Sequence, residues 1–357
     1  MPDPDRPSPD RFPPARFDHL LRLTGPIGLL EHALLDEPRL EHGMCTDDNA
    51  RALLVLCRIE DLSADLAAAF ELYLGFVERG RVGADREAGG WHNRMDLVGR
   101  WLDTVGPDDC HGRALWGLGV AAARAPKHAW RQRATVAFVE GADLDSPFVR
   151  STAYAALGAA AAWDGGSGSA APEAALVLEK ARPRLPRPRP GPWRWPEDRL
   201  TYANARIPEA MIATGSALGD TALVDDGLDL LDWLVEIETG PTGFSFTPVG
   251  GRGPGDPKPA FDQQPIEAWA MADACALATA VTGDARWEQR RRCAVSWFLG
   301  ANDAGASLYD EATGAGFDGL TAQGPNLNRG AESTLAALAA LLPPERPRGR
   351  SDAEEPA

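Results

Sequence analysis

Pairs of adjacent aspartates stand immediately before two Ala- and Leu-rich segments of this chain. Asp47-Asp48 precedes the first of these segments, and Asp108-Asp109 precedes the second. Two carboxyl groups that face each other can break a glycosidic bond, because one protonates the leaving oxygen while the other acts as base or nucleophile. These four aspartates are therefore the candidate catalytic residues.

Arginine or glutamine followed by glutamate three positions later recurs in the second half of the chain. The three copies are Arg206-x-x-Glu209, Gln264-x-x-Glu267 and Arg329-x-x-Glu332. This spacing places both side chains on one face of a helix, where an arginine keeps a neighbouring carboxylate ionised. Together with the other polar residues of these clusters they are candidate substrate contacts; those others are Tyr202, Asn204, Asp262 and Asn328.

Aromatic residues flank the polar clusters and add to the candidate binding residues. Trp91 and His92 lie in the sequence GWHNR, and Trp195 lies in a proline-rich segment. Sugar-binding sites combine aromatic walls with a few polar groups, so these three residues are further candidate substrate contacts.

Helix capping is the alternative interpretation of the polar clusters. Asp, Asn and Ser are common at helix starts, where the side chain accepts a backbone hydrogen bond. Capping accounts for one polar residue per helix, but not for runs such as residues 47–51 and 202–209. The runs as a group therefore indicate a site.

The elements that carry these clusters repeat along the chain. The clusters begin near residues 47, 108, 146, 203, 262 and 326, a mean step of roughly 56 residues, which indicates a repeat architecture. Each is followed by a helical segment that is nearly uncharged after its first turn, the pattern of a helix buried on all sides. Amphipathic segments, typical of outer helices, alternate with them at about 17–36, 63–80, 127–140, 172–183, 221–237 and 285–300.

This alternation predicts an all-α fold, an (α/α)6 toroid of six inner and six outer helices with short β-like segments in the loops. An open solenoid is the alternative, but the terminal units lack the polar capping repeats that open solenoids need. We predict one domain over residues 16–342. The Pro-rich and charged residues 1–15 and 343–357 are predicted to be disordered tails.

Composition excludes several classes of function. The chain has 357 residues and a formal net charge of −16, which argues against binding to nucleic acids or anionic membranes. Five scattered cysteines with no C-x-x-C argue against a disulfide framework or a zinc site. No cofactor motif occurs, so neither a metal nor a cofactor is expected. Without a signal peptide or a membrane-length apolar run, the expected location is cytoplasmic.

The six-fold alternation, with polar clusters at the buried helices, resembles the six-hairpin glycosidase-like superfamily. That resemblance implies an (α/α)6 barrel with its active site in a funnel at the N-terminal ends of the inner helices. The Asp-Asp pairs look like the adjacent aspartates of the endo-mannanase branch. The whole chain is similar to uncharacterised bacterial proteins found beside glycosyltransferases. It departs from the sugar-epimerase branch, which uses paired histidines on inner helices, because only His111 occupies such a position.

These observations predict a carbohydrate-active protein, a glycoside hydrolase acting on an oligosaccharide or polysaccharide. A polysaccharide lyase is an alternative, with Tyr202, Asn204 and Arg206 acting on a uronate. A protein without catalytic activity, which binds glycans or serves as a scaffold in association with a glycosyltransferase, is the alternative from another class.

Overall fold

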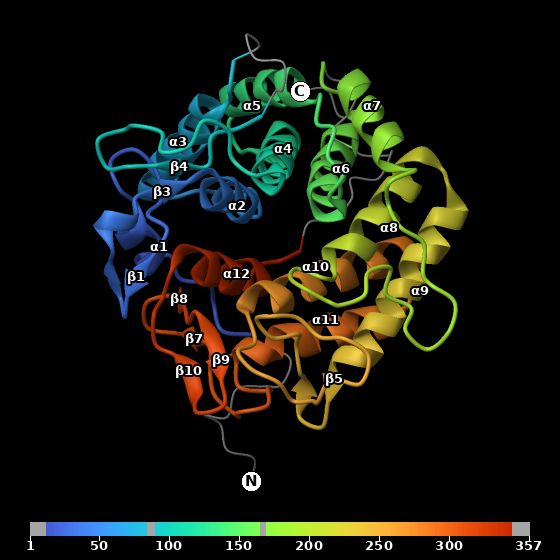
Figure 1. Cartoon of the computed structure of the whole chain (residues 1–357). Coiled ribbons are helices and arrows are strands. Elements are labelled where there is room, and N and C mark those ends of the chain that lie inside the picture. Colours follow the sequence, from blue (N-terminus) through green and yellow to red (C-terminus); the bar gives the residue numbers. More distant parts are fainter. Residues whose placement is uncertain (1–11, 84–89, 165–168, 345–357) are drawn as a thin grey trace.

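The structure is a computed structural model that describes residues 12–83, 90–164 and 169–344. The helices in these ranges form two concentric rings (Figure 1). The inner ring contains α2 (Thr46–Leu56), α4 (Asp108–Arg124), α6 (Val149–Asp164), α8 (Arg206–Leu218), α10 (Pro265–Thr282) and α12 (Ala331–Leu341). The outer ring contains α1 (Asp18–Leu23), α3 (Ala64–Gly80), α5 (His128–Gly141), α7 (Ala171–Ala181), α9 (Thr221–Glu238) and α11 (Ala285–Phe298). Each inner helix contacts the next, and α12 returns to α2, so the ring closes.

Strands in the described part of the chain are confined to short antiparallel pairs in the connections. They are β1 (Ala33–Leu34) with β2 (Glu37–Pro38), β3 (Met44–Cys45) with β4 (Arg94–Met95), β5 (Thr239–Gly240) with β6 (Gly243–Phe244), β7 (Tyr309–Asp310) with β8 (Ala315–Gly316), and β9 (Gly319–Thr321) with β10 (Gly324–Asn326). A single 3-10 turn, Leu40–His42, precedes β3. The all-α toroid with short β-like loop segments is thus confirmed.

Small residues let the inner helices approach one another closely. A Cβ added to Gly119 of α4 would lie 2.2 Å from the carbonyl oxygen of Gly158 of α6, which is closer than any non-bonded contact. Only glycine allows this crossing. The small residues that made these segments look buried in the sequence therefore also set the spacing of the ring.

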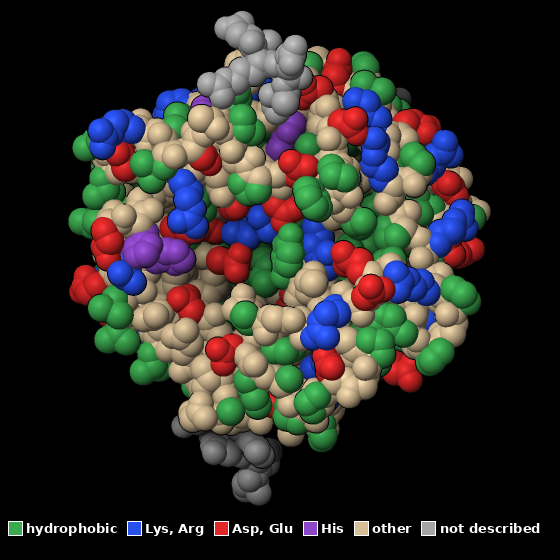
Figure 2. All heavy atoms as spheres, in the orientation of Figure 1, with side chains coloured by type: hydrophobic (Ala, Val, Ile, Leu, Met, Phe, Trp, Pro, Cys, Tyr) green, Lys and Arg blue, Asp and Glu red, His purple; other side chains and the backbone are tan. Residues whose placement is uncertain are grey.

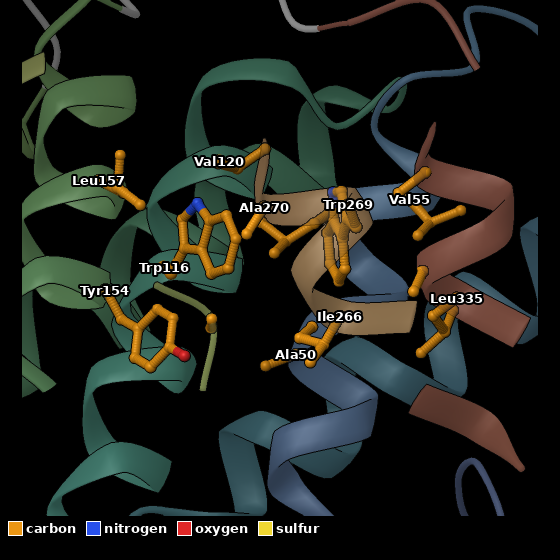
Figure 3. Packing of buried hydrophobic residues seen from close by; sticks show 14 of the residues in the cluster. Ala50, Val55, Trp116, Val120, Tyr154, Leu157, Ile266, Trp269, Ala270 and Leu335 are labelled. Atoms are coloured by element: carbon orange, nitrogen blue, oxygen red, sulfur yellow. The ribbon is translucent and has the colours of Figure 1, made fainter. Parts of the chain in front are cut away.

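The core fills the middle of the ring with aromatic and aliphatic side chains. Figure 3 shows Trp116 of α4 and Trp269 of α10 among apolar side chains of α2, α6 and α12. The two indole rings stack with centroids 5.8 Å apart. The guanidinium carbon of Arg206 lies 4.5 and 4.8 Å from the two ring centroids.

The first outer helix is much shorter than predicted. The sequence pattern predicted an outer helix over residues 17–36, but α1 ends at Leu23 and the following residues form a turn and the β1–β2 hairpin. Gly25 and Pro26 explain this end, since both residue types disfavour helix continuation. As a consequence, Glu31 and His32 lie at the N-terminal end of the inner ring and face its interior.

The predicted tails lie mostly outside the described residues, which begin at 12 and end at 344. Within the described part, Phe12 and Ala15 pack against the core. The backbone N–H of Arg16 donates to the Tyr309 hydroxyl at 3.1 Å. The N-terminal connection is therefore part of the fold from residue 12 onward. No helix of the described ranges combines the length and the apolar character needed to cross a membrane.

Candidate functional site

A cavity of about 410 Å³ opens at the N-terminal end of the inner ring. The first turns of α2, α10 and α12 line it, together with the residues just before β1 and β9 and the last residues of β3 and β10. Figure 2 shows acidic and basic side chains gathered around this hollow. Its charged lining residues are Glu31, Asp47, Asp48, Asp318 and Glu332, with Arg51 and Arg113.

Arg51 joins two carboxylates from opposite ends of the chain. Its Nη1 lies 2.6 Å from Asp48 one turn earlier on α2, and its Nη2 lies 2.6 Å from Glu332 on α12. Burial raises the pKa of the Asp48 carboxyl, while the thiol of Cys45 donates to the same carboxyl at 3.1 Å. This ion pair connects the first and last inner helices at the cavity wall.

Arg113 of α4 plays the same part for a second pair of carboxylates. Its guanidinium lies 3.1 Å from Asp47 and 3.4 Å from Asp109, and the Asn93 amide donates to Asp47 at 3.2 Å. Burial alone would raise the pKa of Asp47, but the guanidinium groups of Arg113 and Arg51 outweigh it and hold that pKa below its ordinary value. Asp47 is therefore an ionised carboxylate in the cavity wall.

Glu31 is a cavity carboxyl that the sequence pattern did not indicate. Arg94 donates to its Oε1 at 2.8 Å, while its Oε2 is buried and has no hydrogen-bond partner among the described residues. Burial, followed by the charge of Asp48, raises the pKa of Glu31 to about 7. The site thus holds a carboxyl that is half protonated near neutrality beside ionised Asp47.

Asp109 and Tyr202 lie next to the cavity, linked to it through Arg113. The Tyr202 hydroxyl donates to Asp109 at 2.5 Å, and the Ser151 hydroxyl donates to the same carboxylate at 2.6 Å. The Tyr202 side chain is 43% exposed, and the guanidinium carbon of Arg150 lies 4.8 Å from its ring centroid. One face of this ring is thereby supported in an exposed position near the cavity.

Asp108 and the predicted aromatic contacts do not line the cavity. Asp108 accepts a hydrogen bond from Ser146 at 2.6 Å. The indole N–H of Trp91 donates to the Val77 carbonyl at 2.7 Å, and the fully buried Trp195 stacks on Trp233. The imidazole of His92 also makes contacts within the protein: it stacks on Trp101 and lies 2.8 Å from the Asp103 carbonyl oxygen. Trp91 and Trp195 are buried and the His92 side chain is 20% exposed, and none of the three lines the cavity.

Asn204 and Glu267 fasten the loop before α8 to α10. Glu267 accepts hydrogen bonds from the backbone N–H of Ala203, and from the backbone and side chain of Asn204 at 3.1 and 3.0 Å. Burial, followed by the nearby charge of Glu238, raises the pKa of Glu267 to about 8. Both side chains are buried, so their observed contacts are structural.

Arg206 and Glu209 lie away from the N-terminal cavity. Arg206 is 1% exposed and pairs with Glu209 at 2.6 Å and with Asp273 of α10 at 3.0 Å. Glu209 and Asp273 line a second cavity, of about 210 Å³, formed by the later turns of the inner helices. The i, i+3 spacing correctly pairs Arg206 with Glu209, but this pair lies against the core tryptophans.

Three other candidates precede their helices and do not reach the cavity. Asp262 is exposed, three residues before α10. The Asn328 amide oxygen accepts from the backbone of Leu35 at 2.9 Å, and the Arg329 guanidinium lies against Phe317. Gln264, the residue before α10, does line the cavity.

The described residues contain no group of three or more His, Cys, Asp or Glu side chains placed to hold a metal ion. His111, the histidine on an inner helix, is buried, and its Nε2 contacts the carbonyl of Gly141 at 2.9 Å. The cavity is lined by carboxyl and guanidinium groups together with the imidazole of His32, the thiol of Cys45 and the hydroxyl of Ser333.

Known proteins resemble this chain in fold and not in sequence. No family model matches the chain, and no curated protein matches its sequence significantly. A sugar epimerase from a ruminal bacterium has a similar structure, with a TM-score of 0.68, 10% identity, and 90% of this chain and 94% of that chain covered. For cellobiose 2-epimerase from Spirochaeta thermophila the TM-score is 0.65, with 11% identity and 92% and 93% of the two chains covered. A GH76 α-mannanase from Bacteroides thetaiotaomicron has a TM-score of 0.56, with 10% identity and 84% and 85% covered.

The chain thus has the (α/α)6 fold of the six-hairpin glycosidase-like proteins, as the sequence predicted. At about one residue in ten identical, these likenesses concern the fold. The features of this chain that bear on its reaction are the carboxyl groups that line the cavity.

Proposed function

We propose that this protein is a carbohydrate-active enzyme, a glycoside hydrolase whose proton donor is Glu31 and whose base or nucleophile is Asp47. The observation that carries the proposal is the pairing of these carboxyls in one cavity with opposite shifts of pKa, Glu31 raised to about 7 and Asp47 lowered. Two carboxyls of opposite protonation are what cleavage of a glycosidic bond needs.

The proposed reaction uses the contacts around each group. The Glu31 carboxyl would donate its proton to the leaving oxygen, since its Oε2 has no competing hydrogen bond. The Asp47 carboxylate would activate water or attack the anomeric carbon, and Arg113 and Asn93 would hold its orientation. Burial, followed by the negative charge of Asp48, raises the pKa of Glu31 and so favours its protonated form, which makes Asp48 a tuning residue in this scheme.

Glu31→Gln tests the assignment, with Glu37→Gln in the neighbouring β1–β2 hairpin as the matched control. We expect Glu31→Gln to lower turnover of natural glycans by about 10²–10⁴, the usual contribution of a positioned acid or base. Aryl glycosides with acidic leaving groups should lose less, because they leave without protonation. Glu37→Gln changes an exposed side chain that pairs with Arg22, so turnover should stay at the wild-type level.

Release of new reducing ends measures the reaction. Asp47→Asn should abolish turnover of both substrate types, because its role does not depend on the leaving group. Wild-type turnover by Glu31→Gln would remove the proposal.

A sugar epimerase is the second candidate, favoured by the similar structures of two epimerases. An epimer formed without new reducing ends would identify this activity in the same assay. The lyase alternative gains no support, since Arg206 is buried away from Tyr202 and the cavity. Sugar binding without turnover would indicate a glycan-binding or scaffold protein, for which co-purification with a glycosyltransferase is the test.

A further inference from the structure

The N-terminal cavity carries more negative than positive charge. Four carboxylates face the cavity beside Glu31, namely Asp47, Asp48, Asp318 and Glu332, against the guanidinium groups of Arg51 and Arg113. Helix N-termini add about half a positive charge each, but this effect fades within the first turn, where Asp47, Asp48 and Glu332 already use it. The cavity therefore stays acidic.

Both cavity arginines are occupied by the protein's own carboxylates. Arg51 contacts Asp48 and Glu332, and Arg113 contacts Asp47 and Asp109. A uronate, sulfate or phosphate group in the cavity would have to compete with these pairs. An anionic sugar is therefore disfavoured.

Asp318 and Glu332 offer acceptors to a ligand. Asp318 accepts from the Gly330 backbone at 2.6 Å and from the Ser333 hydroxyl at 2.5 Å, and both hydrogen bonds go to its Oδ1. Glu332 shares its one arginine with Asp48, and its side chain is 41% exposed. Ser333 follows Glu332 in the chain and donates its hydroxyl hydrogen to Asp318, so the two carboxylates lie in the same region of the cavity wall.

Stacking contributes little to recognition within this cavity. Among the described lining residues none is Trp, Tyr or Phe, and Pro265 and Cys45 are the main apolar contributors. A neutral sugar site normally uses an aromatic wall for the apolar face of the ring. Selectivity here must come from charge and hydrogen bonds.

We propose that the sugar bound in this cavity carries a free, protonated amino group, which lies against the carboxylates of Glu332 and Asp318. This inference rests on the proposed function for the location of the substrate. The formal net charge of −16 acts in the same direction, since it attracts cationic and repels anionic ligands over long range.

Binding of four related sugars tests the proposal independently of linkage. Glucosamine, glucose, N-acetylglucosamine and glucuronate have the same pyranose ring and differ in one substituent. Titration calorimetry or ligand-observed NMR at pH 6 should show glucosamine binding about tenfold more tightly than glucose, as for one charge-assisted hydrogen bond. Glucuronate should bind weakest.

Glu332→Gln and Asp318→Asn should each remove most of the glucosamine preference. Asp318→Asn keeps an oxygen that can accept the Gly330 and Ser333 hydrogen bonds, so it should fold normally. The proposal can therefore still be tested if Glu332→Gln fails to fold. Glu311→Gln, an exposed residue in the β7–β8 turn, makes the same change in net charge and should leave the preference intact.

The outcomes separate this inference from the proposed function. Equal binding of glucose and glucosamine, or tightest binding of glucuronate, would overturn the amino-sugar assignment and leave hydrolysis standing. Selective glucosamine binding that Glu332→Gln abolishes, with no cleavage of β-1,4-linked glucosamine or glucose oligomers, would support the assignment and count against hydrolysis. Cleavage of the glucosamine oligomer in preference to the N-acetylated one would support both.

Discussion

At the scale of residues, the cavity is organised by two arginines that each serve two carboxylates. Arg51 holds Asp48 and Glu332, while Arg113 holds Asp47 and Asp109. Buried charges are tolerated only when they are paired, so this sharing lets four carboxylates gather at one place. Glu31 lies beside these pairs, with the half-exposed Arg94 at 2.8 Å and the His32 imidazole at 3.5 Å from its Oε1, and burial followed by the charge of Asp48 raises its pKa to about 7.

The opposite shifts of pKa in Glu31 and Asp47 predict the pH dependence of turnover. Turnover needs Glu31 protonated, so it should fall as pH rises through about 7. It needs Asp47 ionised, so on the acid side it should persist to below about 3.9, the ordinary pKa of an aspartate, as far as the fold survives. A pH–rate profile of kcat/KM checks both limbs, and a profile that stays flat from pH 7 to 9 would exclude Glu31 as the acid.

Stability should respond to Glu31 with a defined sign. Its pKa is raised in the folded state, so between about 4.5 and about 7 the folded chain binds more protons than the unfolded chain. This group therefore makes stability fall as pH rises through that window. Glu267, with its pKa raised to about 8, acts in the same direction, so the difference in Tm between wild type and Glu31→Gln isolates the Glu31 effect. A difference in Tm that does not change with pH would contradict it.

Sequence reasoning finds the carboxylates that begin inner helices, together with Gln264 just before α10, but it misses Glu31, which lies outside the helices, and the arginines Arg51 and Arg113 further along α2 and α4. Asp47, Asp48 and Glu332 stand in first turns and do line the cavity. Arg329 precedes its helix by two residues, so helical spacing does not govern where its side chain lies. Glu31 lies between α1 and the β1–β2 hairpin, in a segment that the amphipathic pattern assigned to a helix, and Pro26 was the available signal for a break.

At the scale of elements, the inner helices depend on small residues where they cross. Gly119 and Gly158 bring the backbones of α4 and α6 into contact. Three of the outer helices, α3, α9 and α11, instead begin at conventional caps, since the side chains of Ser63, Asp220 and Asp284 accept hydrogen bonds from their first turns. Caps and amphipathic spacing are readable in a sequence, and α3, α9 and α11 were predicted within about two residues, as were α5 and α7, which have the spacing without a side-chain cap. A sequence does not show in the same way which residues of two helices will meet where the helices cross.

Gly158→Ala should destabilise the ring, although it improves helix propensity. The new methyl would lie 2.3 Å from the carbonyl oxygen of Leu115, so α4 and α6 must separate. Overpacking of this kind costs about 1–3 kcal/mol or more, while replacing glycine in a helix gains about 1 kcal/mol. Because a backbone clash lies at the upper end of that range, we expect a net loss and a lower Tm.

Gly83→Ala is the matched control, because a Cβ at Gly83 meets nothing within 4 Å. Thermal unfolding of the two variants beside wild type gives the comparison. Equal Tm values for the two variants would show that the α4–α6 crossing yields without strain.

At the scale of the whole molecule, the site exists because the ring closes. Glu31 and Asp47 come from the first unit and Glu332 from the last, and the Ala331 backbone N–H donates to the Glu31 carbonyl at 3.1 Å. The imidazole of His19 on α1 contacts the Arg329 carbonyl at 2.8 Å. Closure was predictable only indirectly, from the missing polar caps of the terminal units, since no local pattern encodes a contact across some 300 residues.

Removal of α12 tests whether the toroid folds as a single unit. A chain that ends at residue 329 loses the buried Leu335 and Leu338 and exposes the faces of α2 and α10 that α12 covers. Two buried leucines alone are worth about 3–6 kcal/mol, and the uncovered neighbours add to that. This sum is comparable with the whole stability of a typical protein, about 5–15 kcal/mol. The truncated chain should therefore lose its cooperative melting transition by circular dichroism and elute as an expanded or aggregated species.

A chain that ends at residue 344 keeps every described helix and is the matched control. In an open solenoid each repeat depends mainly on its neighbours, so loss of the last one would leave most of the array folded. A cooperative transition of the shorter chain within a few degrees of the control would show that behaviour, and would count against both the predicted single domain over residues 16–342 and a site that needs both ends of the chain.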